Sequence, residues 1–314
     1  MGRVEMAKVT LTSVSKQPFL SSDIDDAVAR SIDKLNYDFS HVKTAVIKPN
    51  LCYYWNASTG ETTDGRIVGS IIKYLKQKAS GVQITVAEAD ASAMKTKFCF
   101  GILGYDDLCE QHSVGLMNLS EGEISKRIVT VENQKLTLPF NQALLNADLV
   151  VNVPKLKTHN LVGVTCALKN MFGAISKPRK YSYHRNINSV IVAANKIVPS
   201  HLTVVDGLIV RGSCPKKLGV ILAGDNPLST DAIASKIMGF NPSSVPHLRL
   251  AAREKIGEDR KISLIEDGIT LAQAKKAFPH YSHRMHSFSW ELQLKVLRAY
   301  TTVSGDVLPP FLEK

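Results

Sequence analysis

Residues 44–90 decide the fold and read TAVIKPNLCYYWNASTGETTDGRIVGSIIKYLKQKASGVQITVAEAD. The opening TAVIKPN is a short apolar run closed by polar residues, a pattern typical of a buried strand. After the capping residues Thr62, Thr63 and Asp64, residues 64–79 place apolar side chains at helical spacing. Residues 82–90 form a second apolar strand. Strand, helix and strand in this order predict a βαβ unit with parallel strands and a right-handed crossover.

The alternation continues on both sides of this unit. It predicts strands at 8–14, 202–208 and 218–225, helices at 22–36, 166–175, 188–198 and 229–240, and a helix, strand and loop within 142–159. Residues 127–138 interrupt the pattern with a hairpin around Glu132 and Asn133. The predicted fold class is therefore α/β, with a mostly parallel, doubly wound sheet that carries helices on both faces.

The pattern weakens after residue 240, and this change sets the expected domain organisation. We expect one α/β domain over 1–240, with two lobes of about 1–145 and 146–240 as an alternative. Residues 241–314 are expected to form a helical C-terminal extension, which begins with a helix near 245–257 and ends in an aromatic, basic tail.

Charge is concentrated in one segment of the chain. The 314 residues carry a formal net charge of +11, from 39 Lys and Arg against 28 Asp and Glu, and 44% are hydrophobic, as in a soluble globular protein. Residues 149–220 alone contain eleven cations and a single acid, Asp206, so the rest of the chain is nearly neutral. Any proposed function has to explain this segment.

The five cysteines and the absent motifs exclude several classes of protein. No C-x-x-C pair occurs, so no bound iron–sulfur cluster or disulfide framework is expected. The sequence has no signal-peptide core and no apolar run of about 18 residues, so we expect a cytoplasmic protein without a membrane partner. Nucleotide-binding glycine fingerprints, the zincin motif and the hydrolase elbow are also absent.

Polar residues gather where the predicted strands end. In open parallel sheets, ligands bind beyond the carboxyl ends of the strands, where loop amides and helix N-termini converge. The candidates at these ends are Lys48, Asn50, Glu88, Asp90, Asn152, Lys155, Lys157, Thr158, His159, Asp206, Asp225 and Asn226. Helix capping is the simpler explanation for Asp225 and for Asp231, but it does not apply to a lysine. If Asp206 and Asp225 converge, they would suit a divalent metal such as Mg²⁺.

The densest cluster lies within residues 153–184, VPKLKTHNLVGVTCALKNMFGAISKPRKYSYH. Lysine is suited to holding phosphate or carboxylate, and Lys155, His159 and Lys169 are the strongest candidates here. Thr165, at the start of the predicted helix, and Asn170 are candidate ligand-binding residues. Surrounding cations should lower the pKa of His159 and leave it neutral, as a general base, a metal ligand or a structural residue. A solvated surface is the expectation for Lys177, Arg179 and Lys180.

These motifs together resemble the DUF362 family, whose members mostly have no assigned function. The resemblance covers about residues 8–240 and is most specific in K-x-K-T-H-x-x-x-x-x-T-x-x-x-K-N-x-F-G. The positions that match the family pattern are Lys48, Asn50, Asp64, Lys155, Lys157, Thr158, His159, Thr165, Lys169, Asn170, Gly173, Asp206, Asp225 and Asp231. Many relatives carry ferredoxin-type cysteines, which this chain lacks. The layout of the N-terminal half is also similar to lactate racemase-like proteins.

The leading hypothesis is a small-molecule enzyme that binds an anionic substrate or cofactor in a lysine-rich crevice. Proton transfer next to a carboxylate, as in an isomerase or epimerase, would use Lys155 and Lys169 to hold the anion and His159 to move the proton. A nucleic-acid-binding protein that uses the basic 149–220 segment is one alternative. A redox protein that works with a separate ferredoxin is another, and a homodimer is an open alternative for the assembly.

Overall fold

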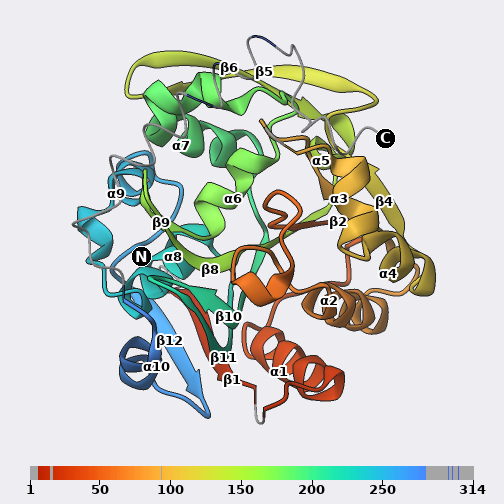
Figure 1. Ribbon diagram of the computed structural model, residues 1–314, viewed down its shortest axis with the longest axis vertical. Coiled ribbons are helices and arrows are strands. Elements are labelled where there is room, and N and C mark those ends of the chain that lie inside the picture. Colours follow the sequence, from red (N-terminus) through yellow and green to blue (C-terminus); the bar gives the residue numbers. More distant parts are fainter. Residues whose placement is uncertain are drawn as a thin grey trace.

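The computed structural model describes residues 6–14, 17–92 and 94–280, together with the single positions 296, 299 and 303. One ten-stranded sheet runs through the molecule (Figure 1), and its main path has the order β12-β1-β11-β10-β7-β2-β3-β4. These strands are β1 (Ala7–Ser13), β2 (Thr44–Pro49), β3 (Gln83–Glu88), β4 (Gly115–Asn118), β7 (Leu149–Val153), β10 (Leu202–Arg211), β11 (Pro215–Gly224) and β12 (Ile262–Asp267). Five of the seven pairings along this path are parallel, which confirms the predicted mostly parallel sheet.

Helices cover both faces of the sheet, as predicted. One face packs against α1 (Ser21–Asp33), α2 (Gly65–Lys78), α3 (Thr96–Ile102) and α4 (Tyr105–Gln111). The other packs against α6 (Ala167–Gly173), α7 (Ile187–Ile197), α8 (Pro227–Ile237), α9 (Pro246–Arg253) and α10 (Leu271–Ala277). Both layers bury an apolar stripe, which is the main stabilisation of such a fold.

The predicted βαβ unit is present as β2, α2 and β3. Asp64 caps α2, since its side chain accepts a hydrogen bond from the backbone N–H of Arg66. The apolar positions Ile67, Ile71 and Leu75 are fully buried, one turn apart along the helix. The strands β2 and β3 pair in parallel register from Thr44 opposite Gln83 to Ile47 opposite Val86.

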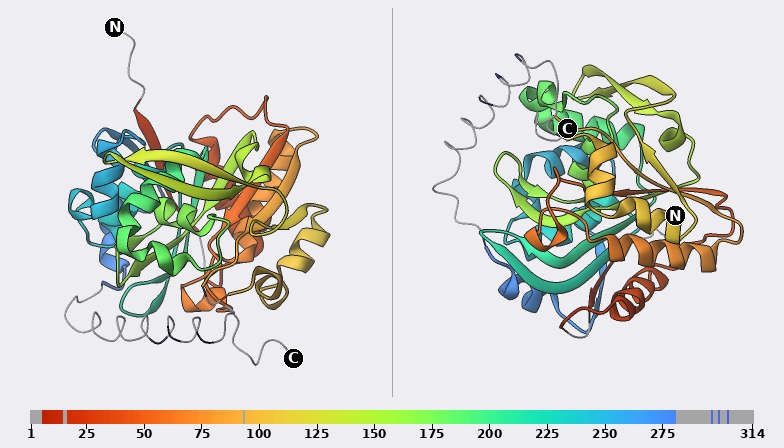
Figure 2. Two further views of the ribbon diagram at one scale, coloured as in Figure 1. Left: turned by 90° about the horizontal axis from the view of Figure 1, so that it is seen from above. Right: turned by 45° about the vertical axis from the view of Figure 1, so that its right-hand side comes forward.

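The predicted hairpin is also present, as β5 (Ile124–Val131) and β6 (Gln134–Asn141). Glu132 and Asn133 both have positive φ, the backbone conformation of a tight two-residue hairpin turn. This two-stranded sheet is separate from the main one and packs against α7 (Figures 1 and 2). The short helix α5 (Gln142–Leu145) then leads into β7.

One sequence prediction about the fold is wrong, and another is wrong in part. Residues after Pro154 were expected to form a loop, but β8 (Lys155–His159) continues beside β10 and pairs with β9 (Gly163–Thr165). The segment after residue 240 is predicted to be helical, and α9 confirms the helix near 245–257 while α10 adds another. Between them, however, β12 pairs in parallel with β1 and extends the sheet. Most of residues 281–314, in which the tail was predicted, lies outside the described residues.

Candidate functional site

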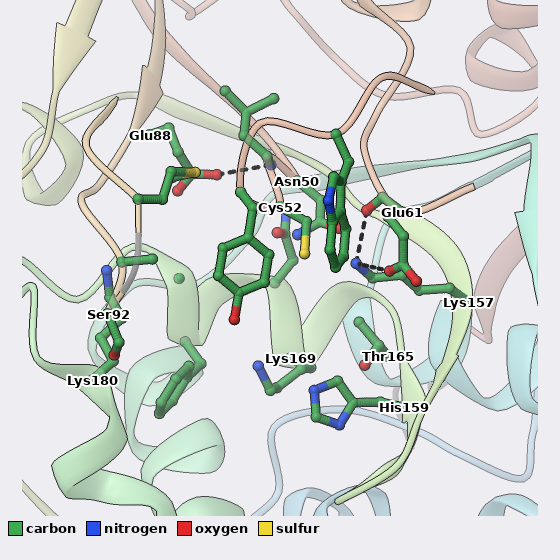
Figure 3. Close-up of a pocket in the computed structure, with 18 of the residues that line it drawn as sticks. Asn50, Cys52, Glu61, Glu88, Ser92, Lys157, His159, Thr165, Lys169 and Lys180 are labelled. Atoms are coloured by element: carbon green, nitrogen blue, oxygen red, sulfur yellow. Dashed lines mark hydrogen bonds and ion pairs between the residues drawn. The ribbon is translucent and has the colours of Figure 1, made fainter. Parts of the chain in front are cut away.

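A cavity of about 430 Å³ lies at the carboxyl ends of β2 and β3, beside β8 and α6 (Figure 3). The short 3-10 helix η2 (Lys180–Asn186) lines part of its wall. Its size falls within the range of small-molecule sites. Of the predicted site residues, the cavity brings together Lys48, Asn50, Lys157, Thr158, His159, Thr165, Lys169 and Asn170.

The cavity lining is strongly basic. Five cations face two carboxylates, so three formal positive charges are in excess when all of these groups are ionised; they are Lys48, Lys157, Lys169, Lys180 and Arg211 against Glu61 and Glu88. Such an excess in a concave, partly desolvated space attracts anions more strongly than the same charges do on an open surface.

Lys48 is the penultimate residue of β2 and is fully buried. Its Nζ lies 2.8 Å from Oε1 of Glu88 and donates to the Pro49 carbonyl at 3.0 Å. Asn170 supports it from α6, because its Nδ2 donates to Asn152 at 2.8 Å and its Oδ1 lies 3.4 Å from the Lys48 amine. Lys48 is therefore already neutralised and fixed inside the protein.

Lys157 and Arg211 share one acid. The Lys157 amine lies 3.1 Å from a carboxylate oxygen of Glu61 and donates to the Glu61 carbonyl at 2.7 Å. Arg211 Nε lies 3.5 Å from the other carboxylate oxygen of Glu61. Two cations with one carboxylate leave this end of the cavity positive.

Among the described residues, the Lys169 amine has neither an acid nor a hydrogen-bond acceptor, whereas Lys180 at least donates to a backbone carbonyl. The Lys169 amine lies 4.6 Å from the centre of the Phe172 ring. Burial, followed by the charges of Lys157 and Lys48, lowers the pKa of Lys169 to about 8. A bound anion would raise the pKa of Lys169 again, because it would stabilise the charged amine. The site therefore favours binding of an anion.

Thr165 adds a second unsatisfied group near Lys169. Its side chain is 4% exposed, and its Oγ1 has no hydrogen-bond partner among the described residues. A buried hydroxyl without a partner costs free energy that a ligand would recover. Thr165 ends β9 and does not begin the helix as predicted; Cys166 is the N-cap of α6.

His159 lies beside these two residues (Figure 3). Burial, followed by the charges of Lys169 and Lys157, lowers the pKa of His159 well below its usual value, the direction that the sequence predicts. Its Nδ1 accepts a hydrogen bond from the backbone N–H of Leu161 at 3.1 Å. The neutral ring therefore carries its proton on Nε2 and is a hydrogen-bond donor there, a different role from the predicted general base.

Lys180 also lines the cavity, although the sequence does not predict it there. Expected on a solvated surface, it is only 5% exposed, and its amine donates a hydrogen bond to the carbonyl of Asp90. Burial is the main cause that lowers the pKa of Lys180 to about 7. Its neighbours Lys177 and Arg179 are exposed as expected, so no local pattern marks Lys180 as different.

Six of the candidates at the strand ends lie outside the cavity lining, namely Asp90, Asn152, Lys155, Asp206, Asp225 and Asn226. Lys155 and Asp206 are both fully buried and form an ion pair at 2.7 Å, and Asp206 also accepts from the backbone N–H of Asp64. Asp225 follows β11, which runs antiparallel to β10, so it lies at the opposite edge of the sheet. Asp206 on β10 lies opposite Ile221 on β11. Asp225 follows Ile221 by four residues, which places it about 13 Å further along the strand.

The predicted metal site at Asp206 and Asp225 is therefore wrong, since the two side chains do not converge. Within the described ranges, no three His, Cys, Asp or Glu side chains are grouped closely enough to hold a metal ion. The helices of the described residues also lack the length and hydrophobicity that a membrane crossing requires.

The fold and the cavity define a class: an α/β protein with a basic ligand pocket at the carboxyl ends of parallel strands. A family described as "Domain of unknown function (DUF362)" matches residues 45–236, and the chain belongs to this family. The family match confirms the resemblance found in the sequence.

Two known proteins are similar to parts of the chain. Thylakoid-associated protein sll1697 of Synechocystis is 25% identical over 133 residues, 38% of this chain and 41% of that relative, so the match spans less than half of the relative's length. The lactate racemase apoprotein from Thermoanaerobacterium thermosaccharolyticum has a TM-score of 0.44 and 13% identity, over 80% of this chain and 57% of that one. This likeness is too distant to carry an activity to the chain.

Proposed function

We propose that the protein is an enzyme that binds a small anionic metabolite, a phosphate or a carboxylate, in the cavity around Lys169. The observation that carries this proposal is the pairing of the unneutralised, half-buried amine of Lys169 with the unsatisfied, buried hydroxyl of Thr165. Together with the neutral ring of His159, these groups supply three donors on one side of the cavity (Figure 3). Charge-assisted hydrogen bonds of this kind are the usual means of holding an oxyanion.

The proposed reaction class is proton transfer next to a carboxylate. When a proton leaves the neighbouring carbon, negative charge grows on the carboxylate oxygens, and Lys169 and neutral His159 would stabilise it. Lys180 would accept the proton, because burial lowers its pKa to about 7 and leaves a large fraction of the amine uncharged near neutral pH. This assignment moves the base from His159 to Lys180 and takes Lys155 out of the reaction.

The inward direction of several cations favours a pocket over a nucleic-acid surface. Lys155, Lys157 and Lys180 belong to the basic 149–220 segment, yet each is at most 5% exposed. A duplex or single strand binds to a continuous exposed basic surface, and these residues do not contribute to one. The alternative of a redox protein that works with a separate ferredoxin stays a prediction, and no observation here favours it.

The test of the proposed function is anion binding by the full chain and two variants. Lys169→Met removes the charge at nearly constant side-chain length. Lys177→Met is the matched control, because Lys177 also lies over an aromatic ring, 5.0 Å from the centre of Tyr183, but is exposed and outside the cavity. Titration calorimetry with phosphate, sulfate and malonate measures the affinities.

We expect Lys169→Met to lose affinity by about 10-fold or more, since a hydrogen bond to a charged group contributes roughly 1.5–3 kcal/mol. Lys177→Met should bind as the wild type does. If wild-type protein binds none of the three anions, or if both variants lose affinity equally, the proposed function is wrong. A change of affinity by orders of magnitude between low and moderate salt, seen with an oligonucleotide, would favour the nucleic-acid alternative.

A further inference from the structure

The cavity is much larger than an inorganic anion needs. Its volume of about 430 Å³ compares with roughly 30 Å³ for a water molecule in the liquid. A phosphate or carboxylate group at Lys169 and Thr165 would fill only a small part of this space. A metabolite that fills the cavity therefore has a larger part besides its anionic group. The cavity walls away from Lys169 would contact this part of the ligand.

One of these walls consists of the aromatic residues Tyr53 and Trp55, which follow β2. Their ring centres lie 5.0 Å apart and both side chains line the cavity. Trp55 is 47% exposed, although tryptophan is among the residues that gain most from burial. An exposed indole at a cavity is a surface on which a ligand can complete the burial.

The backbone of this loop is held in an unfavourable conformation. Tyr53 has φ of +51°, in the left-handed region that residues with a Cβ rarely adopt. The thiol of Cys99 donates to the Tyr53 carbonyl at 3.0 Å, which helps to fix the turn. Strain of this kind collects at functional sites, and the strained residue here lines the cavity.

The second aromatic wall is next to the proposed anion position. Phe172 lies beneath the Lys169 amine, 4.6 Å from ring centre to Nζ, and stacks with His184 at 6.4 Å and an interplanar angle of 23°. Tyr181 lines the same cavity. Aromatic surfaces thus flank the basic centre, an arrangement that serves a flat ring attached to an anion better than it serves a polar chain.

We propose that the natural ligand carries a planar aromatic ring joined to its anionic group, as a mononucleotide does, and that Trp55 stacks on this ring. The inference rests on the proposed function, because it assigns the rest of the molecule whose anion binds at Lys169. Stacking on an aromatic side chain tolerates many ring types, since every such ring offers a π-face. Trp55 would therefore accept a class of ring-bearing anions and not one particular base.

The experiment compares ring-bearing and ringless phosphates on the full chain. AMP, UMP and pyridoxine 5′-phosphate each carry a ring, whereas ribose 5-phosphate carries only the sugar and the phosphate. We expect at least one of the ring-bearing probes to bind roughly 10-fold or more tightly than ribose 5-phosphate. Trp55→Leu should remove that advantage and leave the affinity for ribose 5-phosphate unchanged.

Ile128→Ala is the control variant, because Ile128 is a large apolar residue that is 71% exposed on β5 and does not line the cavity. It should bind all four probes as the wild type does.

If the three ring-bearing probes bind no more tightly than ribose 5-phosphate, the aromatic ligand class is wrong while the anion site stands. If no phosphate binds at all, the proposed function itself fails. An advantage that survives Trp55→Leu would overturn the role of Trp55.

Discussion

Replacing Lys155 with methionine should destabilise the fold and leave anion binding intact. The substitution would leave the carboxylate of Asp206 fully buried without the cation that now lies 2.7 Å away. Breaking a buried pair on one side costs about 3–5 kcal/mol. Asp206 keeps two backbone hydrogen bonds, from the N–H groups of Asp64 at 2.7 Å and Leu208 at 3.0 Å, so we expect a loss near the lower limit, about 3 kcal/mol.

Lys196→Met is the matched control for this prediction. The Lys196 amine also lies 2.7 Å from a carboxylate oxygen, that of Glu254, but the two side chains are 28% and 20% exposed. An ion pair that water reaches contributes about 1 kcal/mol or less. Because the two distances are equal, a difference between the variants reports the effect of burial.

Urea unfolding followed by circular dichroism, with phosphate titrations on the same samples, would measure both quantities. Burial already raises the pKa of Asp206, and loss of Lys155 would raise it further. A carboxyl group with a raised folded-state pKa stabilises the fold below its unfolded pKa and loses that contribution as the pH rises through the folded value. The deficit of Lys155→Met should therefore shrink in acid. A variant with wild-type stability and no phosphate binding would refute the structural role and restore Lys155 to the site.

Three further predictions concern single groups around the cavity. The ring signals of His159 in NMR spectra should not titrate between about pH 8 and pH 6, and a midpoint near the ordinary value of about 6.5 would contradict the lowered pKa. Burial raises the pKa of Asp231 to about 6, so its contribution to stability is present below the unfolded pKa of about 3.9 and is lost as the pH rises through 6. The Asp231→Asn variant should therefore show a flatter dependence of stability on pH between these two values. An unchanged slope would argue against the raised pKa of Asp231. A Cβ at Gly173 would lie 3.2 Å from the Lys48 amine. Gly173→Ala should therefore lower the free energy of unfolding, measured by thermal unfolding, by about 1 kcal/mol and weaken phosphate binding. No change in either quantity would show that Lys48 moves freely.

Periodicity predicted those parts of the fold in which side-chain polarity matches burial. The helix α2 and the strand β3 follow this rule. The strand β8 does not, because its inward side chains include Lys155 and Lys157, which are buried through ion pairs. A hydrophobic pattern cannot mark a strand whose buried residues are lysines.

The site was partly predictable from strand ends. Lys48 and Lys157 were found because the carboxyl ends of neighbouring parallel strands meet at one edge. The same rule failed for Asp225, since a short apolar strand does not show that β11 runs in the opposite direction. Lys180 escaped because its burial depends on a tertiary contact with the carbonyl of Asp90, which is 90 positions away along the chain.

The place of β1 in the sheet has a practical consequence for anyone who trims this protein. The family match begins at residue 45 and ends at residue 236, yet β1 lies between β11 and β12 and pairs with β11 from Val9 opposite Gly224 to Ser13 opposite Val220. A fragment cut to the matched range would leave this side of β11 unpaired, and such an edge invites association between copies. The stretch that defines the family is thus shorter than the stretch that folds, and recombinant fragments should retain β1 and β12.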